Sequence, residues 1–338
     1  MINLIGVNKL FCATSLVLVF LGLFATNALA QIYHVKEMNT EQIKALDREK
    51  TVVILPGGIL EQHGPYLPSF SDGYMNERLT QDLANAIVER PGWKTLIFPL
   101  IPLGSGGANI IGQKYVFPGS FTVRPSTLRT VFMDLATELG EQGFRWIFVI
   151  HLHGAAPHNR ALNQAGDYFH DTYNGHMVNL TGHPLAIAAR RDEVFKLLSE
   201  DERREDASST HAGINETSRI LFLRPDLVNP AYKSAPVIAP RDQKHRVEIA
   251  KAENWPGYFG SPRLASSAFG AKATKLTSSQ TIDLAMKILD GFDYRQMPRL
   301  GDEIPPPAAP SAAGKTFRQH NEEIEKKQQE WLKKKGLE

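Results

Sequence analysis

The sequence predicts an α/β protein, a three-layer α/β/α sandwich built around a mostly parallel central sheet. Short apolar segments rich in β-branched residues alternate along the chain with longer segments in which apolar residues recur at helical spacing. The short segments are apolar throughout, as expected of parallel strands that helices cover on both faces. Clusters of polar residues follow several of these segments. Because ligands of such sheets bind beyond the carboxyl ends of the strands, we expect the functional site there.

The first expected strand covers residues 51–55 (TVVIL) and ends at a Pro-Gly-Gly turn. The first long helix is expected over 74–90, where Leu79, Leu83 and Ile87 recur every four residues. The same criteria predict strands at 95–99, 146–150 and 177–180, and helices at 126–143, 157–173 and 213–222.

Composition narrows the classes of function. The chain has 338 residues, of which 42% are hydrophobic and 22% are charged, values typical of a globular protein. Lys and Arg number 38 against 36 Asp and Glu, and this near balance argues against a nucleic-acid partner. The single cysteine, Cys12, excludes a disulfide scaffold and a metal site built from thiolates.

Residues 1–30 have the features of a secretory signal peptide. Lys9 precedes an apolar stretch over 10–25, and the tripeptide at 28–30 (ALA) fits the rule for cleavage before Gln31. The apolar stretch is shorter than the roughly 20 residues that span a bilayer, and an uncleaved anchor is the alternative. We therefore expect an exported protein, periplasmic or extracellular, with no stable membrane insertion after cleavage of the signal.

The rest of the chain divides into a main domain over 31–300 and a C-terminal region over 301–338. That region begins with a proline-rich linker and continues as a charged helix, in which Phe317, Ile324 and Trp331 recur every seven residues. Such a stripe indicates a helix docked on its own domain or on a neighbouring subunit, and less often a free tail. A second charged segment, 188–206, is expected to form a surface helix or an insertion.

Three clusters of histidines and carboxylates are candidates for chemistry. The first holds Glu61 and His63, whose side chains share one face of an extended backbone, and Asp72 nine residues later. A mixed set of carboxylates and imidazoles suits Zn²⁺, Mn²⁺ or Fe²⁺ rather than Ca²⁺. On spacing alone, a capping glutamate and a surface histidine explain this cluster at least as well.

The other two clusters follow a strand and precede a helix. His151 and His153 come directly after the expected strand at 146–150, with His158 nearby, and only one of the pair need be a ligand. His211 and Glu216 flank the start of the helix at 213–222. Because a helix N-terminus favours a carboxylate, the glutamate also has a simple capping explanation.

Taken together, these segments resemble the creatininase (creatinine amidohydrolase) family. Residues 58–68, followed by Asp72, match that family's G-x-x-E-Q-H-G-P-H-L-P segment and the aspartate that ends it. Residues 151–156 are similar to its N-G-H-G-G-N turn, 211–218 to its H-A-G-E-x-E-T-S, and 117–120 to its F-P-G-T. The order and separation of the motifs match over about residues 45–290.

The resemblance implies a site for divalent metal, two ions of zinc, manganese or iron per chain. The implied ligands are Glu61, His63, Asp72, His153 and Glu216. Of these, Asp72 would bridge the ions. His211 would lie near the metals as a candidate proton shuttle, or as a residue that contacts the substrate or positions a ligand. The resemblance also implies a homo-oligomer, a hexamer or a smaller ring.

Around these motifs the chain departs from the family pattern. His151 and Leu152 stand where the family has Asn-Gly, and Ile214 stands where it has the first glutamate of the third motif. Ala155 occupies the position of a carboxylate that helps to bind metal in creatininase itself. These changes surround the expected substrate pocket, argue against creatinine as the substrate and leave the metal count open.

From the resemblance we expect a metal-dependent amidohydrolase that hydrolyses a small cyclic amide, a formamide or a peptide bond with a metal-activated water. Its partner would be a small-molecule amide. The alternative is a non-catalytic, metal-containing protein that binds a small molecule on the same fold. A serine hydrolase is excluded because the chain has no G-x-S-x-G elbow, and the glycine-rich segment 104–107 lacks the Gly-Lys-Ser/Thr of a phosphate-binding loop.

Overall fold

The computed structural model describes residues 31–183, 193–206, 210–302 and 312–337. The predicted signal peptide at 1–30, most of the predicted linker and the first residues of the charged segment 188–206 lie outside the described residues. No helix within these described ranges is both long enough and apolar enough to cross a bilayer.

The central sheet consists of five parallel strands in the order β1-β3-β2-β4-β5. The strands are β1 (Ile32–His34), β2 (Thr51–Pro56), β3 (Lys94–Ile97), β4 (Trp146–Ile150) and β5 (His176–Asn179). The last four agree with the predicted strands to within two residues at each end. The edge strand β1 was not predicted, because three residues are too few to show a periodic pattern.

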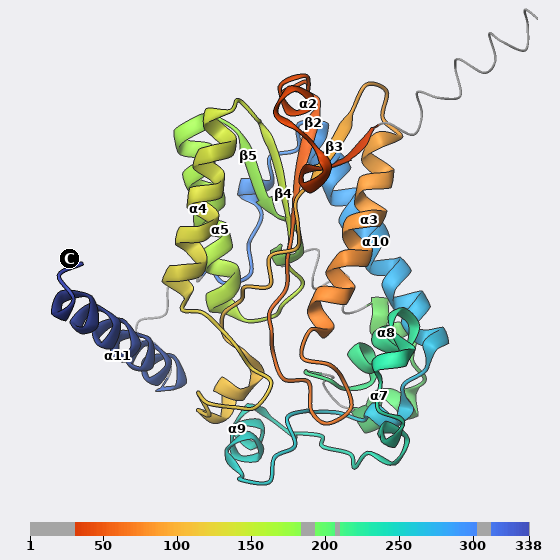
Figure 1. Cartoon of the computed structure of the whole chain (residues 1–338). Coiled ribbons are helices and arrows are strands. Elements are labelled where there is room, and N and C mark those ends of the chain that lie inside the picture. The colour runs from red at the N-terminus through yellow and green to blue at the C-terminus, as the bar shows by residue number, and fades with distance from the viewer. Residues whose placement is uncertain (1–30, 184–192, 207–209, 303–311, 338) are drawn as a thin grey trace, which may run out of the picture.

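Two helices cover each face of the sheet, as Figure 1 shows. Helices α4 (Pro125–Glu141) and α5 (Ala156–Tyr173) lie on one face, and α3 (Ser71–Val88) and α10 (Ser267–Leu289) lie on the other. Alternate residues of β2 face the two layers: Val53 and Leu55 pack with α4 and α5, whereas Val52 and Ile54 pack with α3 and α10. The predicted three-layer α/β/α architecture is therefore confirmed.

Helix α10 is the largest element that the sequence did not reveal. Much of its buried face consists of small polar residues, among them Thr274, Thr277, Ser278 and Thr281, and these give no apolar repeat. Its start is marked by Ser266, whose hydroxyl accepts a hydrogen bond from the backbone N–H of Phe269. Two of these side chains are hydrogen-bonded to neighbouring helices: Ser278 donates to Asp82 of α3, and Thr277 accepts from Arg219 of α8 (Ile214–Leu223).

Three shorter helices lie at the edge of the sheet at which β2 and β4 end, namely α7 (Glu200–Asp206), α8 and α9 (Gln243–Lys251). The short helix α2 (Thr40–Lys44) lies at the opposite edge, where β2 begins (Figure 1). The chain also forms 3-10 turns at Val35–Glu37, Ala108–Gly112, Leu180–Gly182, Pro225–Leu227, Pro230–Ser234, Pro262–Leu264 and Tyr294–Gln296.

The charged segment 188–206 is more than a surface insertion in the part that the structure describes. Val194 and Leu198 are buried in a small apolar cluster with residues of α8 and α10. The carboxylate of Asp206 is fully buried and accepts hydrogen bonds from the backbone N–H groups of Ile214 and Ser261. These contacts tie the segment to the start of α8, while α7 forms the expected surface helix, in which only Asp206 is buried.

The C-terminal helix α11 (Ala312–Lys334) stands at the side of the main body (Figure 1) and docks on it through residues of its first and middle turns. Tyr115 stacks on His320 with ring centroids 4.2 Å apart and on Phe317 at 6.5 Å. Arg124 pairs with Glu325 at 3.1 Å. The helix therefore docks on its own domain, which was one of the alternatives left open by its apolar stripe.

Candidate metal centre

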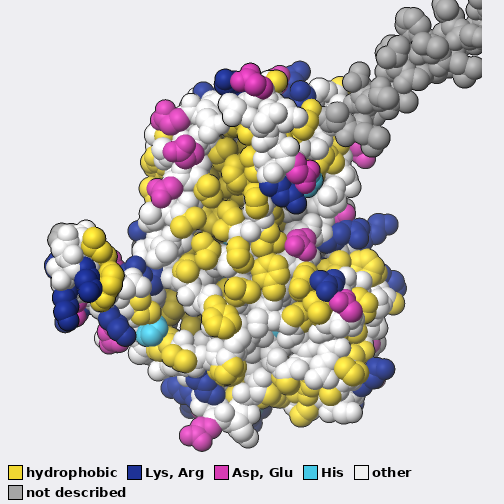
Figure 2. All heavy atoms as spheres, in the orientation of Figure 1, with side chains coloured by type: hydrophobic (Ala, Val, Ile, Leu, Met, Phe, Trp, Pro, Cys, Tyr) yellow, Lys and Arg dark blue, Asp and Glu magenta, His cyan; other side chains and the backbone are white. Residues whose placement is uncertain are grey.

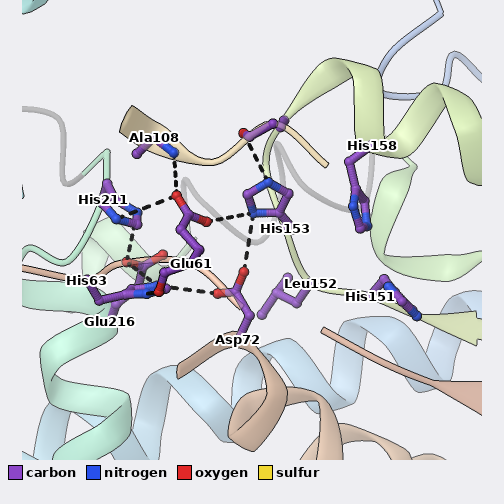
Figure 3. Close-up of polar contacts among 12 residues, drawn as sticks. Glu61, His63, Asp72, Ala108, His151, Leu152, His153, His158, His211 and Glu216 are labelled. Carbon is purple, nitrogen blue, oxygen red and sulfur yellow. Dashed lines mark hydrogen bonds and ion pairs between the residues drawn. The ribbon is translucent and has the colours of Figure 1, made fainter. Parts of the chain in front are cut away.

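The five implied metal ligands meet beyond the carboxyl ends of β2 and β4, from three distant parts of the chain (Figure 3). Glu61 and His63 lie on the loop after β2, and the chain turns there through Gly64, whose φ of 68° favours glycine. Asp72 lies in the first turn of α3. His153 follows β4, and Glu216 lies in the first turn of α8.

Asp72 occupies the middle of this cluster and points between the two histidines, as Figure 3 shows. Its Oδ1 lies 3.6 Å from Nε2 of His63, and its Oδ2 lies 3.2 Å from Nδ1 of His153. On one side His63 Nε2 also faces Glu216 Oε2 at 3.7 Å; on the other, His153 Nδ1 faces Glu61 Oε2 at 3.2 Å. Two groups of three ligand atoms, each group within 4.8 Å, therefore share Asp72.

The side chains fit divalent metal ions. His63 Nε2 and Asp72 Oδ2 are buried and have no hydrogen-bond partner. The other ring nitrogen of His63, Nδ1, lies 2.9 Å from the backbone carbonyl of Glu61. With the proton on Nδ1 donated to that carbonyl, the lone pair of Nε2 points into the cluster. Imidazole and carboxylate groups arranged in this way are the ligands that zinc, manganese and iron take in proteins.

The buried carboxylates of the cluster favour positive charge beside them, as the pKa values of the neighbouring histidines show. Burial alone would lower the pKa of His63 and of His153, but the neighbouring carboxylates outweigh it and raise these values to about 10 and about 9. Burial alone would raise the pKa of Asp72, but the two histidines hold it well below its usual range. Without metal, protons on the imidazoles balance the carboxylates, and a cation that binds must displace them.

Backbone N–H groups hold two of the carboxylates in place. The N–H of Ala108 donates to Glu61 Oε1, and the N–H of Ala212 donates to Glu216 Oε2 at 2.5 Å. Glu61 is almost fully buried, and this burial raises its pKa despite the nearby histidines. The carboxylate of Glu216 is the more accessible of the two, with 23% of its side chain exposed.

His211 lies against the same cluster, with its Nε2 3.6 Å from Glu61 Oε1, and forms a third group of possible ligand atoms with Glu61 and His63. Its Nε2 lies 2.6 Å from the backbone carbonyl of Gln62, and its Nδ1 lies 3.9 Å from Glu216 Oε2. Burial, with the adjacent His63, lowers the pKa of His211 to about 4, so the ring is neutral at pH 7. The Nε2–H then donates to Gln62, and Nδ1 is left as a base that faces Glu216.

The other two histidines of the second motif lie apart from the cluster (Figure 3). His151 is fully buried, packs edge-on against Phe132, and has both ring nitrogens without a hydrogen-bond partner. Burial, with the adjacent His153, lowers its pKa to about 3. His158 accepts a hydrogen bond from the backbone N–H of Ser105 at 3.3 Å. Of the histidines near this strand end, only His153 reaches the metal ligands.

A cavity of about 620 Å³ opens from the cluster to the surface. Glu61, Asp72, His153, His211 and Glu216 all line it. The further lining residues include Met75, Ile110, Leu152, Ala155, Phe195, Asn215, Arg219, Arg246 and Thr277. Arg219 was not predicted from the sequence, although it lies three residues after Glu216 and so on the same face of α8.

Comparison with known proteins gives a family match and a set of similar folds. The family model "Creatininase: Creatinine amidohydrolase" matches residues 36–285. A structure from Bacteroides fragilis NCTC 9343, assigned as a creatinine amidohydrolase, is 20% identical with a TM-score of 0.55, covering 78% of this chain and 98% of that one. A comparison with curated proteins gave no match.

The descriptions of two further solved structures name a metal. One is a creatininase described with Mn, which is 20% identical with a TM-score of 0.53. The other is a mutant creatininase of the Zn-Zn type, 20% identical with a TM-score of 0.51. Each comparison covers 76% of this chain and 98% of the other chain. At this level of identity the structures establish a common fold.

Proposed function

This chain belongs to the creatininase family, and from that premise we propose that it is a metal-dependent amidohydrolase acting on a small cyclic amide, a formamide or a peptide bond. The observation that carries the proposal is the position of Asp72, whose two carboxylate oxygens face two separate sets of ligand atoms. A carboxylate shared in this way is suited to bridge two cations, and paired cations are a common device for hydrolysis.

The ligands would divide between two ions. One ion would be held by Glu61, Asp72 and His153, and the other by His63, Asp72 and Glu216. Divalent ions bound here would polarise the amide carbonyl and lower the pKa of a water molecule. The manganese and zinc forms of creatininase to which this fold is similar support those metals.

The protein's own proton carrier would be His211. Its neutral ring has an unprotonated Nδ1 beside Glu216, at the wall of the cavity. This nitrogen is placed to take a proton from the attacking water and to pass it to the departing amide nitrogen. The hydrogen bond from Nε2–H to the carbonyl of Gln62 fixes the ring orientation and stabilises the imidazolium that forms in between.

The competing function is non-catalytic binding of a small molecule beside the metals. The departures at Leu152 and Ala155 favour a ligand different from creatinine, since both residues line the cavity. To decide, the protein is reloaded with Mn²⁺ or Zn²⁺ and assayed on a panel of cyclic amides, formamides and dipeptides. We expect metal-dependent turnover that Asp72→Ala abolishes while the circular dichroism spectrum is kept. Full metal content without turnover on any amide would favour the binding protein.

Export is a further proposal, supported by the charge at Lys9 and the cleavage motif at 28–30. N-terminal sequencing of a periplasmic or extracellular fraction should begin at Gln31 or within a residue or two. Intact Met1 in soluble cytoplasm would contradict export.

Assembly into a homo-oligomer is proposed as well. Large apolar side chains are exposed at Val116 (95%), Phe121 (69%) and Trp331 (55%), and Figure 2 shows hydrophobic side chains gathered over the middle of one face. Extended apolar surface on a soluble protein marks an interaction site. Sedimentation equilibrium measures the assembly, and a monomer at micromolar concentration would argue against it.

A further inference from the structure

Arg219 is a buried cation in the wall of the cavity. It lies on α8, one turn after Glu216, and only 5% of its surface is exposed. Burial lowers the pKa of its guanidinium to about 10, against the raising effect of Glu216, so the group remains charged at neutral pH. Burying a charge is unfavourable unless it is paired, and such a cation therefore needs a partner.

The protein supplies Arg219 with neutral partners. Its Nε–H donates to Oδ1 of Asn215 at 2.9 Å, and its Nη2 donates to the hydroxyl of Thr277 at 2.9 Å. Within the described part of the chain, no aspartate or glutamate forms an ion pair with it. Because a guanidinium has five N–H donors, these two bonds fix its plane and leave further donors for a ligand in the cavity.

The nearest carboxylates are otherwise engaged. Glu61, Asp72 and Glu216 face the candidate metal positions, and two divalent ions would more than offset their three charges. With the metals bound, these carboxylates would be offset and Arg219 would attract an anionic group.

We propose that Arg219 binds a carboxylate of the substrate, so that the amide hydrolysed here belongs to the class of small carboxylate-bearing amides. The assignment rests on the proposed amidohydrolase function, since it takes the metal cluster as the place of the scissile bond. Arginine is suited to the task because its planar fork donates two parallel hydrogen bonds to a carboxylate.

The helix sets the distance between the two ends of the substrate. Residues three apart on a helix have Cβ atoms about 5–6 Å from each other. The carboxylate held by Arg219 would then lie within one or two residue lengths of the amide near Glu216, since an extended chain advances about 3.5 Å per residue. N-acylated amino acids, dipeptides and monoamides of short dicarboxylic acids have this size.

The test compares charged and neutral partners of nearly equal shape. The metal-loaded protein is titrated and assayed with N-formylglycine against N-formylglycinamide, and with succinamate against succinamide. We expect the wild type to favour each carboxylate by at least about tenfold in Kd or kcat/KM. Arg219→Gln should reduce that preference by roughly 10- to 100-fold, the usual strength of a hydrogen bond to a charged group, and leave the neutral members nearly unchanged.

Two further variants separate recognition from structure. Arg219→Lys keeps the charge and should restore part of the preference. Arg224→Gln, at the end of the same helix, removes an exposed guanidinium that pairs with Asp226 and should behave as the wild type. Metal content is measured for every variant, because metal ions attract carboxylates by themselves and must be equal in the comparison.

The outcomes distinguish this assignment from the function on which it rests. Turnover without any preference for the carboxylate, or an equal loss on both members of a pair in Arg219→Gln, overturns the role of Arg219 and leaves the amidohydrolase standing. A preference in binding that Arg219→Gln removes, with no amide turned over, supports Arg219 as a carboxylate site and overturns the hydrolase. Loss of metal in Arg219→Gln with loss of all binding would show that Arg219 only supports the cluster.

Discussion

Replacing Asp72 by alanine should empty both metal positions, whereas replacing either flanking glutamate should empty one. The two ligand groups share Asp72, Glu61 stands beside His153, and Glu216 stands beside His63. Asp72→Ala leaves each group with two protein ligands in place of three. Glu61→Ala and Glu216→Ala each reduce one of these two groups only.

The magnitude follows from these shared ligands. Loss of a hydrogen-bonding partner outside the ligand set costs about 10- to 100-fold in metal affinity, and loss of a ligand should exceed that. Reloaded wild type should therefore hold up to about two ions per chain, Glu61→Ala and Glu216→Ala about one, and Asp72→Ala close to none. Elemental analysis by mass spectrometry after desalting gives the counts.

A matched control lies on the same helix. Asp82 of α3 pairs with Arg78 and accepts a hydrogen bond from Ser278, away from the ligands, so Asp82→Ala should keep the full metal content. Circular dichroism and urea unfolding establish that each variant is folded. Full metal retention in Asp72→Ala would refute the shared-ligand geometry. A loss in Glu216→Ala as large as that in Asp72→Ala would show that the ions are not divided between the two groups.

Three further predictions concern protons and packing. Metal binding near pH 7.5 should release about two protons, because the pKa values of His63 (about 10) and His153 (about 9) keep both rings protonated in the metal-free site. The metal affinity should therefore fall by up to about 100-fold for each unit by which the pH is lowered. Calorimetry in buffers of different ionisation enthalpy measures the number of protons released, and a value near zero contradicts the prediction. His211→Ala should keep its metal and lower kcat by about 10²–10⁴, and a parallel loss of metal would make His211 a ligand instead of a proton carrier. Gly57→Ala would place a Cβ 1.8 Å from Nε2 of His151 and should destabilise the fold by about 1–3 kcal/mol. Adding His151→Ala should recover part of that loss, and strictly additive unfolding energies would argue against the contact.

Periodicity predicted the parts of the fold in which apolar side chains carry the pattern. The strand at Trp146–Ile150 was predicted to the residue, because it is apolar throughout and buried after its first residue. Helix α10 was missed because threonines and serines fill much of its buried face, and the partners of Thr277 and Ser278 lie on other helices, far away in the sequence. The burial of Asp206 was missed because its partners are backbone N–H groups of Ile214 and Ser261, which only the folded chain brings to it.

The candidate site also has a part that the sequence predicted and a part that only the structure shows. The sequence pointed to Glu61, His63 and Asp72 through a motif, and the topology explains why they meet His153: parallel strands β2 and β4 are neighbours and end at one edge. Spacing could not separate His151 from His153. The structure separates them, because His151 is directed into the layer beside Phe132 and only His153 faces the carboxylates.

The charge of the cavity links the departures from the family pattern to the choice of substrate. The family resemblance implies a metal-binding carboxylate at the position of Ala155, and this chain places a methyl group there, in the cavity wall. Arg219 adds a positive charge to the same cavity. Both features shift the metal-loaded cavity towards positive charge, and a substrate without charge would leave the guanidinium buried and unpaired. A carboxylate on the substrate supplies that partner. Placing a carboxylate back with Ala155→Asp should therefore weaken the binding of succinamate relative to succinamide, and an unchanged ratio would show that charge at this position does not govern the choice.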